Sequence, residues 1–258
     1  MSVRSAGSNA DDGPVFIGDL AIDPRFNGPI GWANGGYACG LIAGAIDPDR
    51  SVHTSVEVTL RRPVPLATPL RLVRTANGGH QLSLDDQLIA DVGSTPQAPP
   101  PPPVRPDLLT AGRARLDHPG WPADGPLADC FVCSARRRDG LHVTAGPLPG
   151  HPGAAATPFE PASCRTRIDA AGVVAPEFIW AALDCPSVPV SALLAGRVCL
   201  LGTFAAVLHR EIRIEESLVV VGWVREHERR VYRTASAMID AAGNVVAGAR
   251  ATWIELKG

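Results

Sequence analysis

The sequence predicts an α+β protein built from two copies of one unit, each an antiparallel sheet wrapped around a central helix. Three observations support this prediction. An apolar helix pattern occurs twice, at 34–45 and at 176–184, strand-like segments follow each copy, and a proline-rich stretch separates them. A helix without a polar face is normally buried, and a sheet that packs on it completes a two-layer unit. The two units are expected to join as a pseudo-dimer.

The first unit is expected over residues 13–96, after a disordered N-terminal segment at 1–12. Apolar and polar residues alternate at 55–60, which is typical of a strand with one covered face. Asn77-Gly78-Gly79 predicts a turn between two later strands. The strands predicted in this unit are 15–22, 55–60, 69–75 and 82–92.

A proline-rich linker is predicted at 97–126, because consecutive prolines favour an extended segment without helix or ladder hydrogen bonds. The second unit is expected over 127–258. It repeats the order of the first, with extra residues around 186–196. The strands predicted in it are 140–143, 154–159, 198–214, 217–224, 230–240 and 245–255.

The composition excludes several function classes. The 258 residues carry a formal net charge of −2, so nothing indicates a nucleic-acid partner. No apolar run is long enough to span a bilayer, and the N-terminus does not have the pattern of a signal peptide. The six cysteines therefore indicate reduced thiols, and the expected location is cytoplasmic.

The two helix segments differ at the two positions where a catalytic group would be expected. When they are aligned, Gly35 falls on Pro176 and Ala43 falls on Asp184. Gly35 offers a backbone N–H to an anionic oxygen, whereas proline has none. Asp184 has the carboxylate of a base or nucleophile, whereas alanine has no such group. The sequence therefore predicts one composite site, with one part from each half.

Three segments carry a resemblance to a known family. Asn34-Gly35-Gly36-Tyr37 opens a helix of small residues, Cys130-Phe131-Val132-Cys133 precedes Asp139-Gly140-Leu141, and Trp180–Asp184 ends the second helix. Together they resemble the hotdog-fold acyl-CoA thioesterases, in particular tandem (double-hotdog) members similar to the TesB-like and PaaI-like enzymes. The resemblance implies a tandem hotdog fold and hydrolysis of an acyl-CoA thioester.

The resemblance also implies roles for individual residues. Gly35, assisted by Gly36, corresponds to the oxyanion donor, Asp184 to the general base or nucleophile, and Thr203 to a threonine beside the attacking water. Residues implied in substrate binding are Asn34, Tyr37, Trp180 and Asn27. Coenzyme A is part of the implied substrate, and the resemblance implies no other cofactor and no metal. Pairing of two such chains into a homodimer is a further expectation. The chain departs from the family's Asp-Thr-Gln trio, because the final strand has Arg250-Ala251-Thr252 and no glutamine.

Other interpretations remain open. The chain is alternatively a non-catalytic acyl-CoA or lipid-binding protein, or a hotdog hydratase or dehydratase, although no histidine accompanies Asp184 on its helix. Asp184 is alternatively a structural acid, and Gly35-Gly36 a simple turn. Cys185 with His209 as base is a further nucleophile candidate.

The remaining polar motifs have structural interpretations too. Zinc at Cys130 and Cys133 needs two further ligands, and neither a second CxxC nor paired histidines appear. Glu177 is interpreted as a surface acid, whose negative charge the dipole at the start of the helix stabilises. Arg136-Arg137-Arg138 reads as a solvated loop, with coenzyme A phosphates as the alternative.

Overall fold

The computed structural model describes residues 13–47, 56–95, 97–164, 166 and 168–257. The segment predicted to be disordered, 1–12, lies outside the described residues. The first half contains β1 (Val15–Leu20), η1 (Pro24–Phe26), α1 (Gly35–Ile46), β2 (Val56–Leu60), β3 (Leu70–Arg74), β4 (His80–Leu84) and β5 (Gln87–Ser94). The remainder contains α2 (Leu108–Leu116), β6 (Gly146–Pro147), β7 (Ala154–Phe159), η2 (Pro161–Ser163), α3 (Pro176–Asp184), η3 (Cys185–Ser187), α4 (Val190–Leu194), β8 (Cys199–Leu208), β9 (Leu218–Glu228), β10 (Val231–Ile239) and β11 (Val245–Glu255).

Both helices and most strands of the sequence prediction are present, with three differences. The strand predicted at 82–92 is split into β4 and β5 by a turn, where Asp85 has φ 50°. The segment 140–143 is not a strand, and β6 lies a few residues later. The strand predicted at 198–214 ends at Leu208, and an irregular segment with Ile212 buried in the core follows it.

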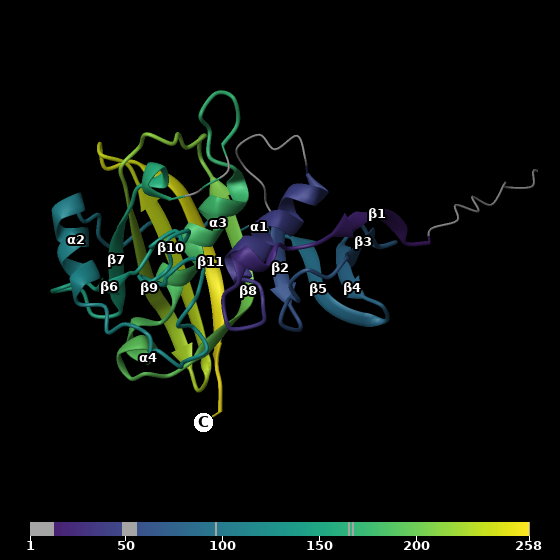
Figure 1. The fold of residues 1–258 in the computed structure, drawn as a ribbon, viewed down its shortest axis with the longest axis horizontal. Coiled ribbons are helices and arrows are strands. Elements are labelled where there is room, and N and C mark those ends of the chain that lie inside the picture. The colour runs from purple at the N-terminus through teal and green to yellow at the C-terminus, as the bar shows by residue number, and fades with distance from the viewer. Residues whose placement is uncertain (1–12, 48–55, 96, 165, 167, 258) are drawn as a thin grey trace, which may run out of the picture.

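The strands form one continuous antiparallel sheet instead of the two separate sheets expected. Its 11 strands run in the order β1-β3-β4-β5-β2-β8-β11-β10-β9-β7-β6. The two halves meet where β2 pairs with β8, through Val58 opposite Phe204 and Thr59 opposite Thr203 (Figure 1). The pairing has a physical reason, since each half alone would leave the N–H and C=O groups of an edge strand unpaired.

The helices α1 and α3 pack against each other beside this junction (Figure 1). Their separation is set by glycine, because a Cβ added at Gly36 would lie 2.3 Å from the Cβ of Asp184. A Cβ at Gly40 would lie 2.8 Å from that of Trp180. Small residues on α1 therefore bring its first turns directly against α3, and both helices belong to the main hydrophobic core.

The segment predicted as a linker, 97–126, is attached to the sheet and contains α2, which the sequence analysis did not predict. Ala111 and Ala114 of α2 pack with Val219 and Val221 of β9, whereas the intervening Val220 faces the main core. Alternate residues of a strand point to opposite faces, so α2 covers the face of the sheet that α3 does not (Figure 1). The proline stretch contributes too, because Pro99 lies against Gly248 of β11.

None of the helices in the described parts of the chain has the length and apolar character needed to cross a membrane.

Candidate active site

The carboxylate of Asp184 lies at the contact between the two helices. The residue ends α3 and is 2 % exposed. Its Oδ2 accepts a hydrogen bond of 2.9 Å from the N–H of Gly36 and one of 3.0 Å from Nδ2 of Asn34. Its Oδ1 is buried and has no hydrogen-bond partner among the described residues. One oxygen of the carboxylate is thus held by two donors, and the other is buried without a hydrogen bond from the described residues.

The first turn of α1 supplies the groups that face Asp184. Asn34 caps the helix, because its Oδ1 accepts the N–H of Tyr37 at 2.9 Å while its Nδ2 reaches Asp184. The first N–H groups of a helix have no partner within it. Tyr37 and Gly36 satisfy theirs through Asn34 and Asp184, and the N–H of Gly35 has no acceptor among the described residues. That N–H is available to an oxyanion.

Burial raises the pKa of Asp184 to about 7, because desolvation disfavours the charged form of the carboxyl group. The hydrogen bond from the Gly36 N–H opposes this rise, the negative charge of a Cys130 thiolate adds to it, and the hydrogen bond from Asn34 lowers it. A carboxyl group with a pKa near neutrality accepts and returns protons readily.

A cavity of about 510 Å³ opens beside these groups. Gly35, Asn34 and Asp184 are on its wall, together with mainly apolar side chains. Arg61 and Arg62 also line it, and both are exposed. Other residues on the wall include Ile30, Leu60, Val64, Leu193, Leu200, Leu201 and Trp253. The volume and lining suit a small-molecule ligand with an apolar part.

Solved structures with similar folds span nearly the whole chain. The tesB protein of Mycobacterium avium subsp. paratuberculosis is 12% identical, with 93% of this chain and 92% of that chain covered and a TM-score of 0.59. A conserved protein with a hot dog fold from Alicyclobacillus acidocaldarius is 12% identical over 96% and 97% of the two chains, with a TM-score of 0.55. Acyl-CoA thioesterase II of Mycobacterium marinum is 17% identical over 88% and 90%, with a TM-score of 0.52.

The chain has a tandem hotdog fold. No family model matches the sequence, and no curated protein matches it. The fold class predicted from the sequence is therefore confirmed, with the two hotdog sheets fused into one.

The two ends of this tandem hotdog's helix pair are not equivalent. At the start of α3, Ala175 makes no side-chain cap and Pro176 has no N–H. The residue of α1 that corresponds to Asp184 is the fully buried Ala43. Glu177 is buried in the first turn of α3, so the interpretation as a surface acid is wrong. The donor groups and the free carboxylate oxygen occur together at only one end.

Two residues implied in substrate binding lie in the core of the tandem hotdog instead. Tyr37 stacks on Phe26, with ring centroids 4.0 Å apart, and Trp180 packs edge-on against Phe204. Neither lines the cavity. Tyr37 also packs edge-on against Phe131 and Phe178, so both rings contribute to the buried core.

The side chains of Asn27 and Thr203 form hydrogen bonds with residues other than Asp184. Asn27 accepts a hydrogen bond from Nη1 of Arg137 and donates one of 2.9 Å to the carbonyl of Asp129. Thr203 of β8 donates to Thr252 of β11 across 2.9 Å. The β8 residue whose side chain lies against Gly35 is Leu201.

The clustering of Cys185 with the CxxC segment was not predicted from the sequence. Cys185 lies next to Cys130 and Cys133, with all three sulfur atoms within 4.8 Å of one another. Hydrogen bonds from the Cys133 and Cys185 thiols lower the pKa of Cys130. His209, the base considered for Cys185, does not line the cavity, whereas Cys185 does. Local spacing gave no sign of this cluster, because its third member belongs to a distant segment.

Proposed function

We propose that this protein hydrolyses an acyl-CoA thioester at a single composite site between α1 and α3. The observation that carries the proposal is the carboxylate of Asp184. It is buried, anchored through Oδ2 by Gly36 and Asn34, free at Oδ1, and on the wall of an apolar cavity. Two of the proteins with similar structures, a tesB protein and an acyl-CoA thioesterase II, support the same reaction class.

In the proposed reaction the thioester carbonyl oxygen accepts the N–H of Gly35. A water molecule bound at Oδ1 of Asp184 attacks the carbonyl carbon, and Asp184 takes its proton. The tetrahedral oxyanion is stabilised by the Gly35 N–H and by the positive end of the α1 dipole. The C–S bond then breaks, the proton passes from Asp184 to the leaving thiolate, and a free acid and coenzyme A are released.

Asn34 serves this reaction as a positioning residue. Its amide holds Oδ2 of Asp184 while its Oδ1 caps α1. A side chain fixed at both ends keeps the carboxylate and the helix N-terminus in one arrangement, which lowers the cost of reaching the reactive geometry. The acyl part of the substrate occupies the apolar cavity, and Arg62 at the cavity wall is available to the coenzyme A phosphates.

The alternative with an observation in its favour is acyl-CoA binding without hydrolysis. The N–H of Gly36 donates to Asp184 and is not available to a substrate oxygen. Counted over the described residues, the site therefore has a single free backbone donor, whereas oxyanion holes commonly use more than one.

A thiol-release assay separates the two functions. The full chain is incubated with short, long and aromatic acyl-CoAs, and coenzyme A release is followed with a thiol reagent. Release by the wild type, with loss in Asp184→Asn, supports hydrolysis. Tight binding of the same acyl-CoAs in calorimetry without thiol release overturns hydrolysis and supports the binding protein. Asp86→Asn, an exposed acid in the β4–β5 turn, is the matched control.

A further inference from the structure

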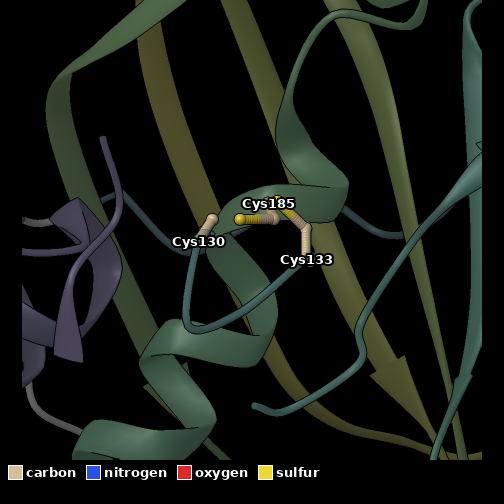
Figure 2. Close-up of side chains that lie close together, drawn as sticks. All are labelled: Cys130, Cys133 and Cys185. Atoms are coloured by element: carbon tan, nitrogen blue, oxygen red, sulfur yellow. The ribbon is translucent and has the colours of Figure 1, made fainter. Parts of the chain in front are cut away.

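Three thiols from two distant segments of the chain converge beside the cavity. Cys130 and Cys133 come from the loop before β6, and Cys185 from the turn that follows α3. Their sulfur atoms all lie within 4.8 Å of one another, and Figure 2 shows the three side chains pointing toward a common centre. Cys130 and Cys133 are buried and Cys185 is half-buried. All three are free thiols.

The backbone around the two loop cysteines is held firmly. The N–H of Phe131 donates to the carbonyl of Asn27 at 2.8 Å, and that of Ser134 donates to the carbonyl of Cys130 at 3.0 Å. Val143 donates its N–H to the carbonyl of Val132 at 2.9 Å. The convergence of the sulfur atoms is thus built into hydrogen-bonded backbone, and it does not depend on the free rotation of exposed side chains.

Two side-chain nitrogen donors contact the sulfur atoms. Nε1 of Trp121 donates to Sγ of Cys133 at 3.2 Å, and Nδ2 of Asn34 makes a longer contact of 3.9 Å with Sγ of Cys185. Outer hydrogen bonds of this kind orient the ligands of metal sites. The two contacts thus place polar N–H groups of Trp121 and Asn34 beside the sulfur atoms of Cys133 and Cys185.

We propose that Cys130, Cys133 and Cys185 bind one Zn²⁺ ion. Thiolates are preferred ligands of zinc, and sulfur atoms about 2.3 Å from a shared tetrahedral ion lie about 3.8 Å apart. The observed separations are compatible with that arrangement. Within the described ranges no fourth histidine, cysteine or carboxylate joins the group. All three cysteines are on the wall of the cavity, and a water molecule on that side would complete the tetrahedral set.

The other three cysteines of the chain do not lie in such a cluster within the described residues. Cys39, Cys164 and Cys199 are buried singly, and none is part of a group of this kind. Cys164 directs its thiol to the carbonyl of Leu141 at 3.1 Å, as an isolated thiol does. Clustering therefore distinguishes three of the six cysteines, and a shared ion would account for it.

The proposed ion would join the 130–133 loop to the end of α3, directly beside Asp184. Metal binding of this kind contributes to folding and requires deprotonated ligands. The inference does not depend on thioester hydrolysis, and its test does not measure activity.

The test measures metal in the full-length protein, purified without chelator from zinc-supplemented cells. We expect about one zinc per chain by mass spectrometry. We expect loss of most of it in Cys185→Ser, and full content in the controls Cys164→Ser and Cys199→Ser. A wild type with less than about a tenth of an equivalent of zinc overturns the proposal, as does a folded Cys185→Ser with full zinc content.

Cobalt provides a readout that does not depend on the variants folding. Wild-type protein exchanged with Co²⁺ should show sulfur-to-cobalt charge transfer in the near ultraviolet and the visible bands of a tetrahedral ion. The absence of these bands, or a disulfide among the three cysteines after purification under argon with reductant, overturns the site.

Discussion

The N–H of Gly36 donates a hydrogen bond to Oδ2 of Asp184 across 2.9 Å, and it links the first turn of one buried helix to the last residue of the other. The contact needs glycine, because the two residues are closer than a side chain at position 36 would allow. Gly36 thus allows the close packing of α1 on α3 and also holds the carboxylate of Asp184.

Replacement of Asp184 by asparagine should reduce thioester hydrolysis by about 10²–10⁴-fold, the range typical of a lost general base. The amide keeps an oxygen for the Gly36 N–H and removes a buried charge, so we expect no fall in thermal stability. The measurement is kcat by thiol release, together with the melting temperature. Turnover close to that of the wild type would remove Asp184 from the mechanism.

Replacement of Gly36 by alanine should destabilise the fold by about 1–3 kcal/mol, the usual cost of overpacking. The new Cβ would lie 2.3 Å from Cβ of Asp184 and 2.9 Å from the carbonyl oxygen of Trp180. Chemical denaturation measures the change in unfolding free energy. Gly18→Ala is the control, since nothing lies within 4 Å of its added Cβ. Equal stability of both variants would contradict the close helix contact.

The two roles of Asn34 can be separated by two substitutions. Asn34→Ala removes the cap of α1 and the donor to Asp184, so both stability and kcat should fall, stability by about 0.5–2 kcal/mol. Asn34→Ser restores a capping oxygen but is too short to replace the amide at Asp184. We expect it to recover stability and to leave kcat low. Recovery of both together would show that Asn34 acts only as a cap.

Arg137 should contribute strongly to stability. Its guanidinium binds both oxygens of Asp139 at 2.9 and 3.0 Å, the carbonyl of Arg25 at 2.8 Å, and Asn27. Arg137→Ala removes these hydrogen bonds and should cost about 1.5–3 kcal/mol, the value for hydrogen bonds to charged groups. The exposed neighbour Arg138 is the control, with a change within about 0.5 kcal/mol in urea unfolding. A similar effect of both variants would refute the distinction.

Arg62 should affect binding of the coenzyme A end of the substrate. It is exposed at the cavity, whereas Arg61 is paired with Asp91 at 2.6 Å. Arg62→Glu should raise KM for an acyl-CoA several-fold and leave KM for the matching acyl-pantetheine, which lacks the nucleotide phosphates, unchanged. Arg113→Glu, on α2, is the control. An equal rise for both substrates would exclude a phosphate contact.

The helices of the core and most of the strands could be predicted from sequence patterns. The two buried helices were predictable because they lack a polar face, and most strands because apolar residues alternate along them. The helix α2 was missed because its mean character is neither apolar nor clearly amphipathic, and it follows a run of prolines. Tyr37 and Trp180 were predicted to bind substrate because they are close to Asn34 and Asp184 in the sequence. Burial of a large aromatic ring in the core is more favourable in free energy.

The sequence by itself determined the duplicated α+β pattern and the asymmetry between Gly35 and Pro176 and between Ala43 and Asp184, since these depend on local periodicity and on residue identity. Only the tertiary structure decided that β2 joins β8, that Leu201 faces Gly35, and that Cys185 meets the CxxC loop. The reason is that these contacts join segments far apart along the chain, and the packing of the whole core selects which of them meet.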